Sequence, residues 1–118
     1  MLKSIVMVTM LVTNLNITEE AYNNHLNYEV VDRGVIDDQL STIWDADGML
    51  DHPYLVMQPS SNQEVYLRFI ECEDTTNYKP VGTHGWNSTE ILVQDPDQLA
   101  LDLKNSEFDI IGMPYDLY

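Results

Sequence analysis

The order of short apolar runs along this 118-residue chain constrains its fold more than any single motif does. The first run, residues 5–12, contains Ile, Val and Thr and has the length of a buried β-strand. Beyond it, residues 17–27 form an amphipathic helix whose one face carries Ala21, Tyr22, His25 and Leu26. A strand followed at once by a helix predicts an α+β fold with two layers.

Two residues compete to begin that helix. Asn16 has Glu19 three positions later, which is the spacing of a capping box, and Thr18 is the alternative cap. The sequence does not decide between them, so either residue is expected at the helix start.

The rest of the chain alternates strand-like runs with turn residues and two short helices. The strands are expected at residues 28–36, 54–58, 65–71, 86–93 and 108–113. One helix is expected after Asp37 or Asp38, with Leu40, Ile43 and Trp44 as its apolar face, and another after Asp95-Pro96. Residues 72–84 hold few apolar side chains and are expected to connect two parts of the chain.

The charge excludes several classes of partner. Twenty acidic side chains against five basic ones give a net charge of −15, which opposes binding to nucleic acid or to an anionic membrane. The acids are scattered, which favours a general solubility role, whereas a focused acidic face would fit a basic partner protein. One cysteine permits no internal disulfide and suits a reducing compartment, so a cytoplasmic location is expected.

The order of the expected elements and the turn residues between them resemble those of the vicinal oxygen chelate superfamily. This superfamily comprises the glyoxalase, dioxygenase and bleomycin-resistance-like proteins, which are built from βαβββ modules. The likeness is carried by Val12-x-Asn14, Tyr22, Leu26-Asn27-Tyr28-Glu29-Val30 and a second start at Val93-Gln94-Asp95-Pro96-Asp97. The resemblance implies a curved mixed or antiparallel sheet with helices packed on one face.

The resemblance also implies a domain organisation. Residues 1–118 form a single domain, in which residues 1–81 make a complete module and residues 82–118 begin a second, truncated one. The family pairs two complete modules into a cup-shaped sheet, and an incomplete sheet leaves an unpaired edge. We therefore expect a homodimer that pairs or exchanges strands.

The metal site typical of the family is not expected here. The family's ligand positions on the first, fourth and fifth strands fall on Met7, Arg68 and Ser88, and Arg has no lone pair to offer a cation. The three histidines, His25, His52 and His84, show no metal-ligand spacing. Neither a metal nor another cofactor is therefore predicted.

A candidate pocket follows from strand alternation and the resemblance together. Its five predicted residues are Tyr66, Arg68, Trp86, Ser88 and Glu90. Arg68 is expected either to form a structural ion pair with Glu90, which we favour, or to hold the carboxylate of a small acidic ligand against Trp86 and Tyr66.

Three functions follow from these observations. The leading hypothesis is a small-ligand-binding or interaction protein of glyoxalase-like fold that uses no metal. The alternatives are a glyoxalase-like or dioxygenase-like enzyme whose active site is shared across a dimer, and an acidic protein that binds a basic partner. No nucleophile elbow, phosphate loop or dinucleotide fingerprint is present in the sequence, so whether the protein is an enzyme is left open.

Overall fold

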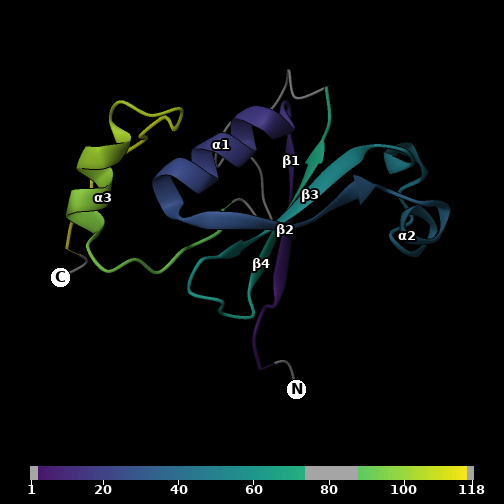
Figure 1. Ribbon diagram of the computed structural model, residues 1–118, viewed down its shortest axis with the longest axis horizontal. Helices are drawn as coiled ribbons and strands as arrows, with labels where there is room; N and C mark the ends of the chain where they lie inside the picture. The colour runs from purple at the N-terminus through teal and green to yellow at the C-terminus, as the bar shows by residue number, and fades with distance from the viewer. Residues whose placement is uncertain (1–2, 74–87, 117–118) are drawn as a thin grey trace. The chain divides into compact units, whose positions relative to one another are not determined.

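The computed structural model describes residues 3–73 and 88–116 (Figure 1). Its elements are β1 (Met7–Val12), α1 (Leu15–Leu26), β2 (Tyr28–Val35), α2 (Asp38–Ile43), the 3₁₀ turn η1 (Asp47–Met49), β3 (Pro53–Pro59), β4 (Tyr66–Glu71) and α3 (Pro96–Leu103). The chain divides into two compact units, Met1–Tyr78 and Lys79–Tyr118, of which the first holds the sheet and the second holds α3. The predicted α+β class is confirmed.

The four described strands form one mixed, open sheet in the order β1-β4-β3-β2. β1 runs parallel to β4, and the β2–β3 and β3–β4 pairs are antiparallel. A parallel pair needs a long crossover connection, and α1 begins the one that leads from β1 to β4. Figure 1 shows α1 lying across the strands, and it contacts β2, β3 and β4.

The main core lies between α1 and one face of this sheet, which we call the helix face. Successive strand residues point to opposite faces, so every second side chain of β3 and β4 enters this core. The buried strand residues of the helix face are Tyr28, Leu55, Met57, Leu67 and Phe69. The Tyr22 ring of α1 packs against them, with its centroid 4.8 Å from that of Phe69.

Helix α1 begins earlier than the sequence suggested. Its N-cap is Asn14, whose side-chain oxygen accepts a hydrogen bond from the Ile17 N–H at 3.0 Å. The expected caps Asn16 and Thr18 both lie inside the helix, and the Thr18 hydroxyl donates to the Asn14 carbonyl. The prediction was wrong because Asn14 is already extended where β1 ends, which leaves its side chain free to cap the first turn.

The expected partner of that cap has another role. Glu19 makes no capping box, and its carboxylate accepts a hydrogen bond from the Arg33 guanidinium at 2.8 Å. This ion pair joins α1 to β2 on the helix face.

The second unit contains the predicted helix but lacks the predicted strands among its described residues. Asp95 caps α3 by accepting from the Gln98 N–H at 2.9 Å, and Pro96 opens the first turn, as expected. The stretches 88–93 and 108–113 are not in strands, which corrects the prediction for their described parts. A strand needs a neighbour for its backbone groups, and apolar periodicity alone does not supply one. That residues 82–118 begin a second module stays a prediction.

Candidate functional site

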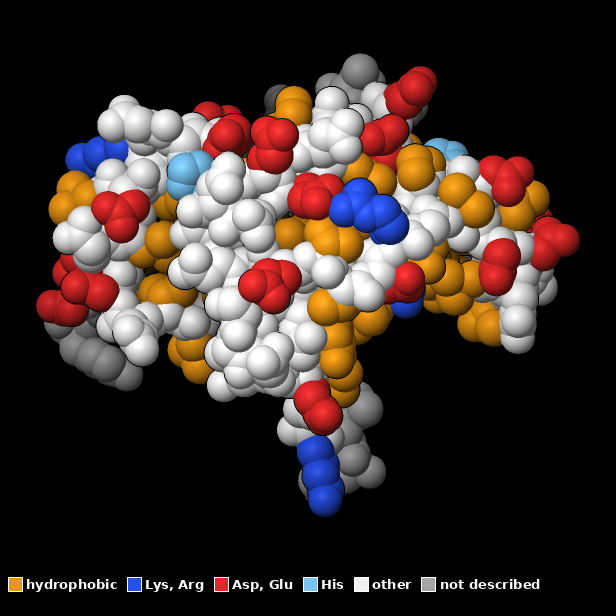
Figure 2. All heavy atoms as spheres, in the orientation of Figure 1, with side chains coloured by type: hydrophobic (Ala, Val, Ile, Leu, Met, Phe, Trp, Pro, Cys, Tyr) orange, Lys and Arg blue, Asp and Glu red, His pale blue; other side chains and the backbone are white. Residues whose placement is uncertain are grey.

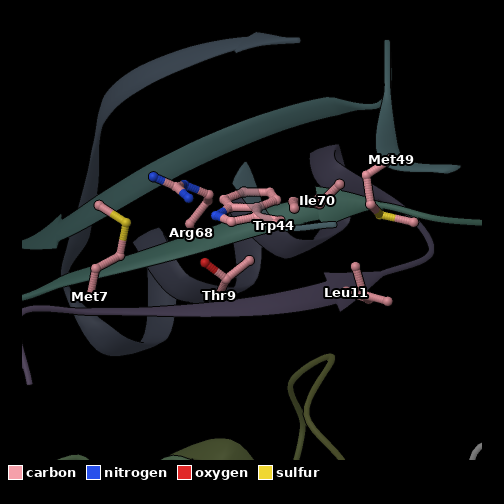
Figure 3. A pocket seen from close by; sticks show the side chains of 7 residues that line it. All are labelled: Met7, Thr9, Leu11, Trp44, Met49, Arg68 and Ile70. Carbon is pink, nitrogen blue, oxygen red and sulfur yellow. The ribbon is translucent and has the colours of Figure 1, made fainter. Parts of the chain in front are cut away.

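The face of the sheet opposite α1 carries a hollow of about 560 Å³, and we call this the hollow face (Figure 3). Three elements surround the hollow: β1, β4 and the segment from the end of α2 through η1. The lining residues are Met7, Thr9, Leu11, Trp44, Met49, Arg68 and Ile70. All but Thr9, Arg68 and the indole N–H of Trp44 present apolar groups.

Strand register brings two walls of the hollow together. Thr9 of β1 lies opposite Arg68 of β4 in the parallel pairing. Because side chains alternate, Met7 and Leu11 point to the same side as Thr9, and Ile70 points to the same side as Arg68. Figure 3 shows these side chains following the two neighbouring strands.

The third wall depends on a short helix between β2 and β3. Asp37 caps α2 by accepting from the Leu40 N–H at 2.8 Å, as one of the two expected caps. The helix ends at Ile43 and Trp44 is its C-cap, whose N–H donates to the Leu40 carbonyl at 3.1 Å. The chain then passes through η1, and Trp44 and Met49 are thereby held over the hollow face.

Arg68 stacks on Trp44 at the centre of the hollow. The guanidinium carbon lies 5.1 Å from the centroid of the Trp44 ring, within the range of a cation–π contact. Among the described residues of the first unit, no carboxylate pairs with Arg68 and no acceptor takes its N–H groups. The half-buried Arg68 thus keeps its hydrogen-bonding edge free toward the hollow and solvent.

A hydrogen-bonded pair of side chains lies on the β2 side of the same face. The Tyr54 hydroxyl donates to the Asp32 carboxylate at 3.0 Å, and this bond raises the pKa of Tyr54 above its ordinary value. The negative charge of Asp37 adds to the increase, and the positive charge of Arg68 opposes it. The hollow face is therefore polarised, with acidic groups toward β2 and the guanidinium over β4.

Metal ligands do not gather in the described part of the chain. No group of three His, Cys, Asp or Glu side chains is placed to hold a metal ion within residues 3–73 or 88–116. The Nδ1 of His52 lies 2.7 Å from the Glu71 carbonyl oxygen, and His25 is half-buried in the last turn of α1. His84 lies outside the described residues.

The predicted pocket residues fall into three groups. Tyr66 and Arg68 share one face of β4, as strand alternation predicted, and Arg68 lines the hollow. Ser88 and Glu90 are exposed residues of the second unit and are not in a strand. Trp86 lies outside the described residues. The five-residue pocket and the Arg68–Glu90 ion pair therefore stay predictions.

Sequence reasoning missed the aromatic partner of Arg68. Trp44 was assigned to the apolar face of a short helix, and Thr9, Leu11 and Met49 were assigned to no site. The alternation of Met7, Thr9 and Leu11 was visible in the sequence. It becomes a signal for a site only once the pairing of β1 with β4 is known.

Acidic side chains are distributed widely over the surface. Figure 2 shows carboxylates spread over the visible face rather than gathered in one patch. None of the helices in the described ranges is both long enough and apolar enough to cross a membrane.

Comparisons with known proteins do not assign the chain. No family model, no curated protein and no solved structure matches it. The hollow and the residues that line it are therefore the features of this chain that point to a function.

Proposed function

We propose that this protein binds a small ligand in the hollow, without a metal, on a fold of the vicinal oxygen chelate type, and that it acts in the cytoplasm. One observation carries the proposal: Arg68 lies over the Trp44 ring in a mostly apolar hollow and has no carboxylate partner within the first unit. An apolar concavity with a few convergent polar groups is the common form of a small-molecule site.

A purely structural role accounts for Arg68 less well. Stacking on an aromatic ring contributes about 0.5–1 kcal/mol at exposed sites. This contact requires no hydrogen bond, and within the first unit no described acceptor takes the N–H groups of Arg68. A Leu or Ile at this position would fill the hollow without the cost of desolvating a charge. Arg68 is better explained if its free N–H groups meet an acceptor supplied by a ligand.

The absence of a metal in this proposal rests on the chemistry of two positions. The resemblance places family ligand positions on Met7 and Arg68, and both side chains line the hollow. A thioether is a poor ligand for a hard divalent cation, and a guanidinium cannot coordinate one. The β-α-β-β-β order of the sheet and the parallel pairing of β1 with β4 support the resemblance.

A homodimer forms part of the proposal, and the two edges of the sheet support it. Residues 4–13, which include the edge strand β1, carry no charged side chain although the net charge is −15. The other edge strand, β2, carries Glu29, Asp32 and Arg33. Charged side chains protect edges against pairing, and β1 lacks that protection. Native mass spectrometry should show twice 13.6 kDa, and a monomer at every concentration would contradict the dimer alone.

A fragment screen on the full-length chain tests the ligand site. Methyl resonances of Met7, Leu11, Met49 and Ile70 report on the hollow, and those of Met57 and Leu67 report on the helix face as an internal control. We expect some fragments to shift the first group and leave the control group unchanged. A diverse library that shifts neither group, or the control group only, would contradict the proposed function.

A further inference from the structure

The two arginines of the first unit differ in what satisfies their charge. Arg33 lies on the helix face of the sheet, where the Glu19 carboxylate accepts from it at 2.8 Å. Arg68 lies on the hollow face, and no described carboxylate of the first unit neutralises it. In a chain with 20 acidic residues, a half-buried arginine that has no carboxylate partner is the group best placed to attract an anion.

The remaining walls favour an apolar body on that anion. Met7, Leu11 and Met49 offer apolar side-chain surface beside the buried Ile70, and the Thr9 hydroxyl is the one polar side chain on the β1 wall. Burial of hydrocarbon against such walls contributes about 25 cal/mol per Å² of apolar surface removed from water. A small, fully hydrated anion such as acetate would leave this surface unused.

The charges around the hollow disfavour a second negative group. Asp32, Asp37 and Arg68 all act on the Tyr54 hydroxyl, which places two carboxylates on the β2 side of the hollow face. Inside the hollow, a second anionic group would meet either these acids or the apolar walls, and both positions are unfavourable.

We propose that the ligand is a small organic monoanion, with its carboxylate on the free edge of Arg68 and its apolar body along Met7, Leu11, Met49 and Ile70. This inference rests on the proposed function and adds the chemical class of the ligand. A guanidinium binds a carboxylate through two parallel N–H···O bonds, and the Trp44 ring orients the group in advance. A hollow of about 560 Å³ lies within the size range of small-molecule sites.

Three probes of equal chain length separate charge from hydrophobicity. Octanoate carries one carboxylate, octan-1-ol carries none and octanedioate carries two. Calorimetry and methyl NMR on the full-length chain should show octanoate binding about tenfold or more tightly than either of the others, since a hydrogen bond to a charged group contributes about 1.5–3 kcal/mol. The shifts should appear at Met7, Leu11 and Ile70.

Matched variants assign the preference to one arginine. Arg68→Gln should reduce octanoate affinity about tenfold and leave octan-1-ol affinity unchanged. Arg33→Gln removes the same charge from the helix face and should leave both affinities unchanged. Because Arg68→Gln and Arg33→Gln each remove one positive charge, a difference between them cannot arise from overall charge.

The outcomes separate this inference from the proposed function. Equal binding of octanoate and octan-1-ol in the hollow, unaffected by Arg68→Gln, would overturn the monoanion and leave the ligand site standing. Tighter binding of octanedioate would also overturn it. If no probe and no library fragment shifts the methyl resonances of the residues that line the hollow, the proposed ligand-binding function is itself contradicted.

Discussion

The helix face and the hollow face of the sheet are made by alternate residues of the same strands, yet they are completed differently. On β4, Leu67 and Phe69 enter a core closed by α1, whereas Arg68 points into a hollow that α2 and η1 only partly cover. The apolar side chains of the helix face are buried against α1. The hollow face also buries Ile70, but it keeps Arg68 without a carboxylate partner from the first unit and leaves Met7 and Leu11 exposed.

The largest expected contrast is between neighbouring residues of one strand. Phe69→Ala removes a side chain that is 1% exposed and packed on Tyr22, and it should lower the free energy of unfolding by about 3–5 kcal/mol. Arg68→Ala loses little more than its stacking on Trp44 and should cost about 1 kcal/mol or less. Urea denaturation monitored by circular dichroism measures both. Equal costs would mean that the hollow face is core as well.

A smaller effect tests how α1 is anchored over the helix face. Asn14→Ala removes the cap that accepts from Ile17 N–H, and it should lower the free energy of unfolding by about 1 kcal/mol. Asn16→Ala is the matched control, because Asn16 lies on the exposed side of the first turn, and it should change stability little. The same denaturation experiment compares them, and an equal or larger loss from Asn16→Ala would restore the cap expected from the sequence.

The smallest contrast concerns tyrosines, whose pKa values rise for different reasons on the two faces. Burial raises the pKa of Tyr22 and Tyr28 on the helix face, whereas a hydrogen bond to Asp32 is the main cause for Tyr54. Asp32→Asn should therefore lower the pKa of Tyr54 and leave Tyr22 unchanged, as ring NMR signals followed against pH would show. A fall at Tyr22 as well would contradict the separation of the two faces.

The sign of the resulting pH dependence follows from linkage. The folded state holds the Tyr22 and Tyr28 protons more tightly than the unfolded chain does. The resulting contribution to the free energy of unfolding is therefore fully present below pH about 10. This contribution is lost as the pH rises through the raised pKa values of the folded state. Denaturation at several alkaline pH values should show this loss, and Tyr22→Phe should reduce its slope.

Local signals predicted most of the first unit. The runs at 5–12, 54–58 and 65–71 formed β1, β3 and β4 within two residues at each end, and Asp95-Pro96 began α3 as expected. The predicted strands at 86–93 and 108–113 are not strands in their described parts, although their composition suits a strand. Strand formation needs a paired neighbour, which composition does not encode.

The candidate site was predictable only in part. Alternation placed Tyr66 and Arg68 on one strand face, and the structure agrees. The stacking of Arg68 on Trp44 was not predictable, since α2 and β4 are separated by η1 and β3 along the chain. No pattern within a few residues of either side chain points to the other.

The sequence by itself determined the approximate bounds of the four strands of the first unit, which side chains share a strand face and how acidic the protein is. These properties depend on a residue and its near neighbours, through backbone preference, the two-residue period of a strand and simple charge. Only the tertiary structure decided that Thr9 lies opposite Arg68, that α1 closes one face, and that Trp44 reaches the other. Those contacts join distant parts of the chain, and the packing of the whole unit selects them.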